Sequence, residues 1–215
     1  MVDRGRLISF EGLDGAGKTT QMQLLEQWFT VRHIPYVRTR EPGGTPLGVE
    51  IRHLLFGRSD LVITPLAEAF LFQADRAQHF STVILPALEA GTLVITDRCF
   101  DSSIAYQGAA RGVGVELVEH LSLLATQGHV PDLTILLDLD PALVHGRTDS
   151  DNDQSGREGQ SRFDRETEQF HQRLRQAYLS LAGKYPERIK VIDASQSAER
   201  IHQEIVGLIE PLVEK

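Results

Sequence analysis

The chain has 215 residues, of which 41% are hydrophobic and 24% charged, and its formal net charge is −8. These values are ordinary for a globular chain that buries one sizeable core, so we expect a single domain over residues 1–215. The negative charge argues against a non-specific polynucleotide binder, because such a protein needs a surplus of Lys and Arg to displace the counterions of nucleic-acid phosphates.

Cysteine content and hydropathy predict the compartment. Cys99 is the only cysteine, so an intrachain disulfide is impossible and a reducing environment is expected. The first residues, MVDRGRLISFEG, contain no apolar stretch of signal-peptide length, and no apolar run approaches the length of a membrane span. We therefore expect a cytoplasmic protein with no membrane partner.

Short apolar runs and helical stripes alternate along the chain. Runs rich in β-branched residues or Leu predict strands at 6–12, 35–39, 92–97, 133–139 and 188–194. Helical spacing is clearest in two C-terminal stripes, Phe170, Leu174, Ala177, Tyr178 and Leu181, and then Ile201, Ile205, Leu208 and Leu212. Continuous apolar runs such as TILLDL are typical of strands covered on both faces, which predicts a parallel sheet in an α/β domain.

The segment 147–162, RTDSDNDQSGREGQSR, has almost no apolar residue and predicts an exposed loop between two helices. One interpretation is a tolerated surface insertion. The other is an active-site lid, which is favoured if arginines at its edges have an anion to close upon.

Residues Gly12 to Thr19 spell G-x-x-x-x-G-K-T between a predicted strand and a predicted helix, which is the context of a phosphate-binding P-loop. Glycines let backbone N–H groups surround phosphate oxygens, the helix N-terminus adds positive potential, the lysine reaches the terminal phosphates, and the threonine hydroxyl binds Mg²⁺. The pattern predicts a nucleoside triphosphate site that comprises Gly12, Asp14, Gly15, Ala16, Gly17, Lys18, Thr19 and Thr20.

The rest of the chain narrows the class of P-loop protein. The guanine-reading N-K-x-D signature is excluded, because the only asparagine is Asn152 and it is followed by Asp153. Asp97 ends a predicted strand, where an aspartate is suited to hold Mg²⁺ directly or through water. The alternative is that Asp97 caps the following helix. Arg98 is next to Asp97. Burying its charge at a strand end would be energetically costly unless it binds an anion.

Five runs together identify a resemblance: EGLDGAGKTTQ, REPGGTPLGVEIR, FQADRAQH, DRCFDSSIAYQG and SRFDRE. In order and spacing they are similar to the bacterial thymidylate kinases, from Leu7 to about Leu212. The resemblance implies the P-loop nucleoside monophosphate kinase fold, with a five-stranded parallel sheet flanked by helices and a mobile lid. It also implies transfer of the γ-phosphoryl group of ATP to dTMP, giving ADP and dTDP, usually by a homodimer.

The resemblance also implies which residues hold the acceptor base and sugar. Phe72 would stack on thymine, with Arg76 on the same helix face donating to a thymine carbonyl. Ser103 would bond the base with help from Gln107, and Tyr106 would lie near the 2′ carbon of the sugar. From the residues alone, Phe72 is better explained as a core aromatic in the stripe with Ala69, and Ser103 and Gln107 could be routine polar residues of a helix surface.

Phosphate and hydroxyl contacts are implied for three charged residues. Asp14 is an unusual charge to find in a P-loop, and the family uses an acidic residue there to engage the acceptor's 3′-hydroxyl. Arg52 and Arg98 would hold the acceptor phosphate; the alternative for Arg52 is a solvated helix arginine.

The monophosphate is itself the nucleophile, so positioned cations and Mg²⁺ must neutralise charge during transfer. Within the family, the catalytic arginine comes from either the P-loop or the lid, and here the variable P-loop positions hold Leu13, Asp14, Gly15 and Ala16. The resemblance therefore implies a lid arginine, Arg157 or Arg162, with Arg147 and Arg165 as further candidates. Two departures from the family pattern are Ser161 and Asp164, and a third is Cys99 in place of the usual Tyr or His.

Two other functions are also compatible with the sequence. A deoxynucleoside kinase would need a general base near the 5′-hydroxyl, and Glu41 in REPGG is the one well-placed candidate. Otherwise Glu41 is structural and opens the tight turn that follows it. A regulatory nucleotide-binding protein without turnover is the second rival, and the presence of Lys18, Thr19, Asp97 and Arg98 speaks against it.

Overall fold

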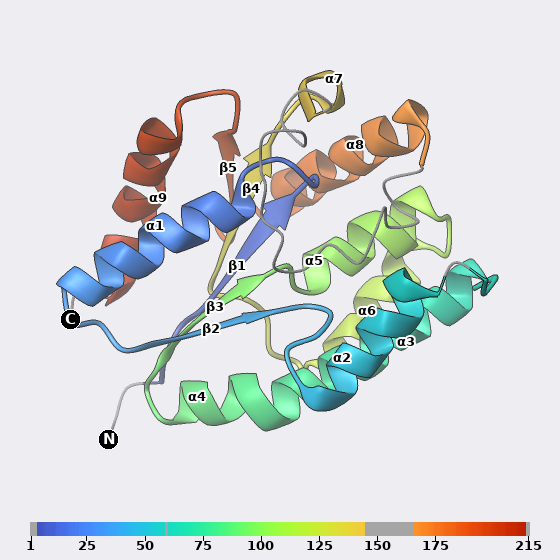
Figure 1. Cartoon of the computed structure of the whole chain (residues 1–215), viewed down its shortest axis with the longest axis horizontal. Helices are drawn as coiled ribbons and strands as arrows, with labels where there is room; N and C mark the ends of the chain where they lie inside the picture. Colours follow the sequence, from blue (N-terminus) through green and yellow to red (C-terminus); the bar gives the residue numbers. More distant parts are fainter. Residues whose placement is uncertain (1–3, 59, 145–165, 214–215) are drawn as a thin grey trace.

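A computed structural model describes residues 4–58, 60–144 and 166–213 and is built around one five-stranded sheet (Figure 1). The strand order is β2-β3-β1-β4-β5, and every pairing is parallel. The strands are β1 (Leu7–Gly12), β2 (Tyr36–Arg40), β3 (Leu93–Asp97), β4 (Leu133–Asp138) and β5 (Ile189–Asp193). All five strand predictions are confirmed, with the bounds within one residue of those expected.

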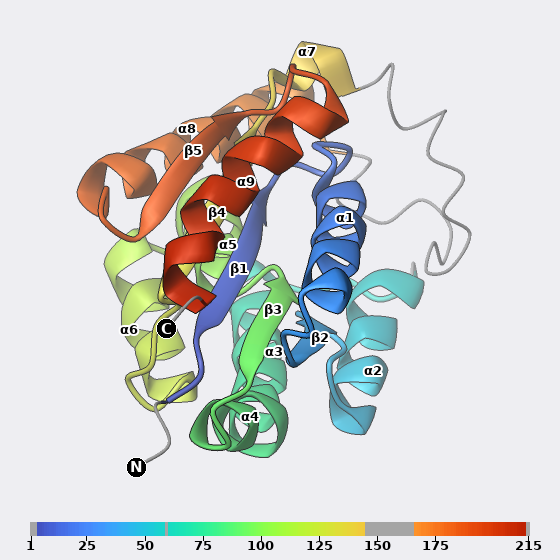
Figure 2. The same cartoon turned by 90° about the vertical axis from the view of Figure 1, so that its left-hand side faces the viewer.

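Helices cover both faces of the sheet, as expected for central strands such as β1 and β4 that are buried nearly throughout. Figures 1 and 2 show α1 (Lys18–Val31) and α9 (Ala198–Val213) together on one face. Helix α8 (Glu168–Lys184) lies on the other face, with the helices between β2 and β4. Helix α7 (Pro141–Val144) follows β4. The two C-terminal helices confirm the predicted stripes, except that Ile209 is fully buried while Leu208 and Leu212 are half-buried.

The segments between β2 and β4 form the wall of the functional site. After β2 come α2 (Pro46–Arg52), the π-helical turn η1 (His53–Gly57), α3 (Pro65–His79), η2 (Phe80–Ile84) and α4 (Leu85–Glu89). After β3 come α5 (Phe100–Ser103), the π-helical segment η3 (Ile104–Ala110) and α6 (Val115–Ala125). Widened helical turns of this kind are frequent at functional sites, and η3 carries two of the predicted site residues, Tyr106 and Gln107.

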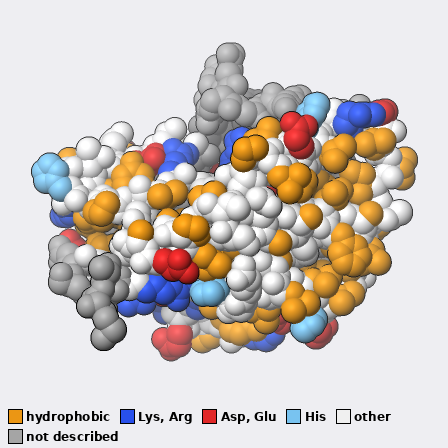
Figure 3. Space-filling view, turned by 90° about the horizontal axis from the view of Figure 1, so that it is seen from below, with side chains coloured by type: hydrophobic (Ala, Val, Ile, Leu, Met, Phe, Trp, Pro, Cys, Tyr) orange, Lys and Arg blue, Asp and Glu red, His pale blue; other side chains and the backbone are white. Residues whose placement is uncertain are grey.

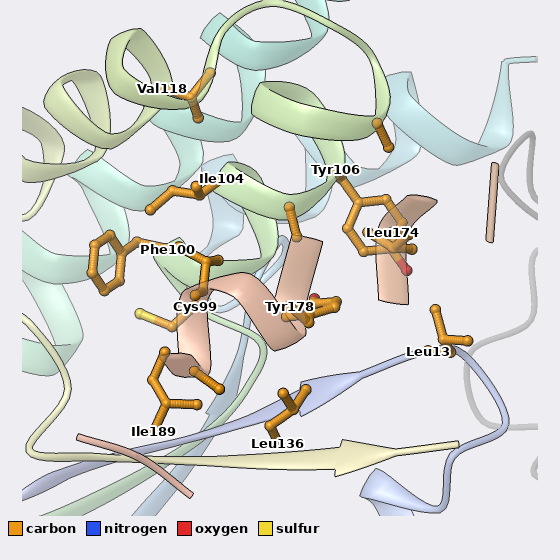
Figure 4. Close-up of a cluster of buried hydrophobic side chains, with 14 of the residues drawn as sticks. Leu13, Cys99, Phe100, Ile104, Tyr106, Val118, Leu136, Leu174, Tyr178 and Ile189 are labelled. Carbon is orange, nitrogen blue, oxygen red and sulfur yellow. The ribbon is translucent and has the colours of Figure 1, made fainter. Parts of the chain in front are cut away.

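The hydrophobic core is divided by the sheet into two layers. Alternate residues of β1 face opposite layers: Leu7 packs with α8, while Ile8 and Phe10 pack under α1 and α9. Figure 4 shows the first layer, in which Tyr106 and Tyr178 lie among apolar side chains between the sheet and the helices. The tyrosine rings are therefore part of the core, while their hydroxyl groups take part in the polar network described below.

Strands β1 and β3 are neighbours, but the helices that follow them, α1 and α5, leave on opposite faces of the sheet. In an open parallel sheet this arrangement forms a ligand crevice outside the carboxyl ends of the strands. Within the described residues, no helix is long and apolar enough to cross a membrane.

Candidate functional site

The P-loop connects β1 to α1 at the crevice, as the sequence predicts. Gly12 has a φ of 130°, and an added Cβ would lie 2.4 Å from the carbonyl oxygen of Leu137. Gly17, with a φ of 93°, is the N-cap of α1 and supplies no side-chain acceptor. The first N–H groups of α1 are thus left to meet an anion, since a helix N-terminus without a side-chain cap favours one.

Lys18 is buried at the start of α1, and its Nζ donates to the carbonyl oxygens of Gly12 at 3.3 Å and Leu13 at 3.0 Å. Its Nζ also lies 3.7 Å from Oδ1 of Asp14. Burial and the charge of Arg98 lower the pKa of Lys18, against the opposing effect of Asp14 and Asp97. The lysine is held inside the loop by weak neutral acceptors, which a phosphate oxygen would outcompete.

Asp97 ends β3 beside Phe10 of β1. Its Oδ1 is buried and has no hydrogen-bond partner in the part of the chain that the structure describes. The alternative that Asp97 caps the next helix is wrong, because the N-cap of α5 is Cys99 and it makes no side-chain capping bond. An unpartnered carboxylate oxygen and the half-buried Thr19 of α1 fit Mg²⁺, which takes oxygen ligands.

The described residues hold no cluster of three or more His, Cys, Asp or Glu side chains that could bind a metal. Mg²⁺ in phosphoryl-transfer sites takes one or two protein ligands and completes its shell with phosphates and water.

Arg98 follows β3 and projects into the crevice from a left-handed backbone conformation with a φ of 67°. One terminal nitrogen, Nη2, donates to Asp14 Oδ1 at 2.6 Å and to the Tyr106 hydroxyl at 3.2 Å. The other, Nη1, donates to Ser102 Oγ at 3.1 Å and to the Tyr178 hydroxyl at 3.2 Å. We call Glu11, Asp14, Arg98, Ser102, Tyr106 and Tyr178 the Arg98 network.

Asp14 is the exposed member of the Arg98 network, with 56% of its side chain accessible. Desolvation raises its pKa, but the charges of Arg98 and Lys18 outweigh that effect and hold the pKa below its usual range. Asp14 is therefore a carboxylate at neutral pH, shared between the two cations at the mouth of the crevice.

Glu11 is the buried acidic member, on β1 one residue before the P-loop. Its Oε1 accepts from the backbone N–H of Cys99 at 2.8 Å, and its Oε2 accepts from Ser102 Oγ at 2.5 Å and from the Tyr178 hydroxyl at 2.9 Å. Burial, with the charge of Asp101, raises the pKa of Glu11 to about 7, although Arg98 and these hydrogen bonds act to lower it.

Arg76 of α3 is the largest fully buried side chain of the described residues. Its Nε and Nη2 pair with Oε2 of Glu41 at 2.9 and 2.8 Å. Its Nη1 donates to Gln73 Oε1 at 2.8 Å and to Ser103 Oγ at 3.1 Å, and Nη2 reaches the Cys99 carbonyl oxygen at 3.2 Å. We call Glu41, Gln73, Arg76, His79 and Ser103 the Arg76 network.

His79 completes the Arg76 network by linking Glu41 to β2. Its Nδ1 lies 3.1 Å from Glu41 Oε1, and its Nε2 lies 2.6 Å from Thr39 Oγ1. Desolvation raises the pKa of Glu41, but the adjacent Arg76 and His79 outweigh it and lower the pKa overall. Glu41 is therefore a buried carboxylate paired with Arg76 and His79.

The other predicted acceptor residues lie around these two networks. Phe72 is half-buried on α3 and packs edge-on against Phe56 at 6.4 Å between ring centroids. Ser103 and Gln107 are buried, so the alternative of routine surface residues is wrong; Gln107 Nε2 donates to Glu68 Oε1 at 2.7 Å.

Arg52 lies at the end of α2, next to the turn that follows β2. Its Nη1 donates to the carbonyl oxygen of Pro42 at 3.2 Å, and its guanidinium lies over the Phe56 ring at 4.9 Å. The Glu41–Pro42 peptide bond is cis. The turn is tied to α3 by the N–H of Gly43, which donates to Asp75 Oδ1 at 3.1 Å.

The structure thus brings the P-loop, Asp97, Arg98 and the acceptor residues of α2, α3 and η3 to one end of the sheet. The roles given to Arg147, Arg157, Arg162 and Arg165 lie outside the described residues. Sequence reasoning missed Glu11 and Tyr178. A glutamate within the apolar strand LISFEG was the available signal for Glu11, because a buried charge needs a reason.

Comparison with known proteins adds an independent finding. Residues 10–205 match the family model described as Thymidylate kinase. A thymidylate kinase of Carboxydothermus hydrogenoformans is 45% identical over 209 residues, covering 97% of this chain and 98% of the relative. Those of Leifsonia xyli subsp. xyli and Bifidobacterium longum (strain DJO10A) are 50% identical over 202 residues and 47% identical over 211, covering 94% and 97% of this chain and 92% and 98% of the relatives.

Proposed function

The chain belongs to the thymidylate kinase family, and on that premise we propose how its residues carry out the family's reaction. The activity is transfer of a phosphoryl group to dTMP, giving dTDP for dTTP synthesis. The donor is ATP, bound on the P-loop, and its γ-phosphoryl group is the one transferred.

One observation carries the proposal at the level of residues. Arg98 and Lys18 both reach the same carboxylate oxygen of Asp14, with Nη2 of Arg98 at 2.6 Å and Nζ of Lys18 at 3.7 Å from Oδ1. Arg98 follows β3, and Lys18 is the lysine of the P-loop at the start of α1. An acceptor phosphate and a terminal donor phosphate held by these two cations would therefore lie next to each other.

The transfer needs no general base, because the second pKa of a phosphate monoester is about 6 and the acceptor is largely a dianion at neutral pH. The barrier is the repulsion between two polyanions and the charge that develops on the transferred group. Lys18 would leave its carbonyl acceptors for the terminal phosphates, and Arg98, aided by Arg52, would hold the acceptor phosphate in line. Asp14 would then be free to accept from the 3′-hydroxyl of dTMP.

Thr19 and Asp97 are the residues that would hold Mg²⁺. The ion would add positive charge beside the donor phosphates to that of Lys18. The buried, unpartnered Oδ1 of Asp97 supports this assignment.

The Arg76 network would read the thymine ring. Glu41 and Gln73 fix the guanidinium of Arg76, and all five of its N–H donors have protein acceptors, so a direct bond to a thymine carbonyl requires one of them, such as Ser103, to be exchanged. Phe72 would stack on the ring, and Tyr106 beside Arg98 would crowd the 2′ position.

A lid at about 147–163 within one kinase domain stays a proposal, with Arg157 or Arg162 as the arginine that meets the transferred group. We expect substitution of the catalytic one by Ala to lower kcat at least 100-fold and substitution of the other to have a smaller effect. Single-turnover kinetics with saturating ATP and dTMP would separate chemistry from binding. If both substitutions lowered kcat by the same small factor, neither arginine would have the proposed catalytic role.

The direct test of function is ADP release with ATP and Mg²⁺, with dTMP, dUMP, dCMP, dGMP and thymidine compared as acceptors. We expect strong preference for dTMP. Turnover only with thymidine would contradict the proposal and favour a nucleoside kinase, and no turnover with any acceptor would favour a regulatory protein. The engagement of Glu41 by Arg76 and His79 speaks against the first of these outcomes.

We also propose a homodimer in the cytoplasm. Exposed apolar side chains lie on α2 and η1, on α3 and on α6, which are neighbours in space: Leu47, Val49, Leu54, Leu66, Phe70, Leu117 and Leu124. Hydrophobic side chains gather on the right of Figure 3, the side where Figure 1 has α2, α3 and α6. Patches of this kind mark protein interfaces.

Sedimentation tests the dimer. We expect Phe70→Glu to shift the protein toward monomer, whereas Val31→Asp, a change of an even more exposed apolar residue at the end of α1, should leave it dimeric. A wild-type monomer at working concentration would overturn the dimer proposal.

A further inference from the structure

Glu11 has no role in the mechanism above, although burying its carboxyl group costs folding free energy. It is completely buried, and among the described residues no Lys or Arg forms an ion pair with it. A buried carboxylate without a paired cation is destabilising, so its presence calls for a task that a neutral side chain would not perform.

The contacts of Glu11 all lead to Arg98 without touching it. One carboxylate oxygen holds the N–H of Cys99, the residue directly after Arg98, and the other holds the hydroxyl groups of Ser102 and Tyr178. Those same two hydroxyl oxygens accept from Nη1 of Arg98. Glu11 is thus linked to both the backbone and the guanidinium of Arg98 through one intervening group each.

Hydroxyl chemistry explains why a carboxylate is needed. A Ser or Tyr hydroxyl has one proton, so it can accept from Arg98 with good geometry while that proton points elsewhere. The two hydroxyl oxygens are only 2.9 Å apart. If one hydroxyl donated its proton to the other, the second proton would still need an acceptor. In its ionised form, which predominates above its raised pKa of about 7, Glu11 is an acceptor only, so its Oε2 takes both protons and leaves both oxygens turned toward the arginine.

We propose that Glu11 is a positioning residue for Arg98: it orients the Ser102 and Tyr178 hydroxyls and the Cys99 backbone so that Arg98 is presented to the acceptor phosphate. This inference rests on the proposed role of Arg98 in holding that phosphate. A Gln at position 11 has the same shape but carries an NH₂ group, which must face either the N–H of Cys99 or the two hydroxyls. Against the N–H of Cys99 it sets donor against donor, and against the hydroxyls it makes their oxygens accept and turns their protons away from position 11; either placement disturbs Arg98.

The test compares dTMP with thymidine, which lacks the phosphate. In titration calorimetry of the full-length protein, we expect Glu11→Gln to raise the Kd for dTMP about tenfold and to change the Kd for thymidine less than twofold. In steady-state kinetics the KM for ATP should not change. General loosening of the site would weaken thymidine binding equally and would overturn the inference.

A matched control is Asp132→Asn, because Asp132 also accepts from a backbone N–H, that of Leu7, and from a side chain, Arg6, but at the opposite end of β1. It should leave both affinities unchanged. Ser102→Ala and Tyr178→Phe should each raise the Kd for dTMP alone, about threefold. In the combined Ser102→Ala, Tyr178→Phe background, Glu11→Gln should add less than twofold, since the hydroxyls it orients are gone.

If Glu11→Gln does not fold, the two hydroxyl variants decide: an unchanged Kd for dTMP in both would overturn the inference. Failure of the wild type to phosphorylate dTMP would overturn the proposed function and this inference together. Turnover by the wild type with an unaltered Kd for dTMP in Glu11→Gln would overturn this inference alone.

Discussion

Arg76 is fully buried and Arg98 is mostly buried in the same crevice, but their charges are neutralised in different ways. Arg76 meets a buried carboxylate directly, that of Glu41, and neutral acceptors take its remaining donors. Arg98 meets three neutral hydroxyls and one carboxylate, Asp14, which is itself exposed and shared with Lys18. One arginine is permanently paired and the other is held by partners that an incoming anion can displace.

The two buried glutamates show the same contrast. The pKa of Glu41 is lowered because Arg76 and His79 outweigh its desolvation, whereas burial raises the pKa of Glu11 to about 7 against the opposing charge of Arg98. The Arg76 network is a closed structural unit suited to recognising a neutral ring. The Arg98 network is left electrostatically incomplete, which suits a site that binds phosphate.

The largest effect should come from breaking the Arg98 network at its centre. We expect Arg98→Ala to lower kcat/KM for dTMP about 1000-fold, because both the phosphate contact and transition-state stabilisation are lost. Initial-rate kinetics with ATP in excess would measure it. Arg200→Ala, which removes an arginine whose side chain is 67% exposed, is the control and should stay within twofold. A loss of less than tenfold for Arg98→Ala would contradict the role of Arg98.

Breaking the Arg76 network should mainly cost stability. Glu41→Gln leaves Arg76 buried without its counter-ion, so we expect the free energy of unfolding to fall by about 3 kcal/mol and the melting midpoint by roughly 6–12 °C. Turnover with dTMP at 25 °C should fall less than ~10-fold. Calorimetry and the ADP-release assay would measure the two.

Glu26→Gln is the control for Glu41→Gln, because Glu26, the ion-pair partner of Arg38, is 24% exposed against 2% for Glu41, and its loss should cost less than about 1 kcal/mol. Near-complete loss of turnover in folded Glu41→Gln would instead support Glu41 as a general base.

The pH dependence of stability would sharpen the contrast between the glutamates. A carboxyl group whose pKa rises from 4.5 to about 7 on folding binds a proton more tightly in the folded state. It stabilises the fold fully below pH 4.5, and that contribution is lost as the pH rises through 7. Relative to Glu11→Gln, the wild type should therefore lose about 2 kcal/mol of unfolding free energy between pH 5 and pH 8.

Urea denaturation of both proteins across that range would measure the difference. Parallel pH profiles for the two would contradict the raised pKa of Glu11. The comparison with the variant is needed because other groups also titrate in this range. One is Asp75, because desolvation and the charge of Glu41 raise its pKa to about 6.

The smallest effect concerns close packing beside the Arg76 network. A Cβ at Gly48 would lie 2.2 Å from Oδ1 of Asp75, the oxygen that holds the turn at Gly43, so we expect Gly48→Ala to destabilise the protein by about 2 kcal/mol. Gly207→Ala, in the open middle of α9, should stabilise it by about 0.5–1 kcal/mol. Melting midpoints would measure both changes, and stabilisation by Gly48→Ala would show that this close approach is tolerated.

Much of the fold and part of the site could be predicted because the determinants are local. The P-loop needs its glycines, lysine and threonine within one turn between a strand and a helix, so spacing along the chain identifies it. The five strands were predicted within one residue because each is a short run rich in β-branched residues or Leu, or a Tyr-Val run, bounded by turn residues; only the central strands β1, β3 and β4 are buried along nearly their whole length. Asp97 and Arg98 could be assigned to the crevice because they directly follow a strand.

Only the tertiary structure decided how the buried charges are neutralised. Glu11 and Tyr178 are 167 residues apart in sequence, and Tyr178 reads as one more member of an apolar helical stripe until the fold turns its hydroxyl toward β1. Ser103 and Gln107 likewise resemble surface residues until α5 and η3 are packed against α3. Hydrogen-bond partners depend on ångström distances between separate elements, and the pattern within any one element does not contain them.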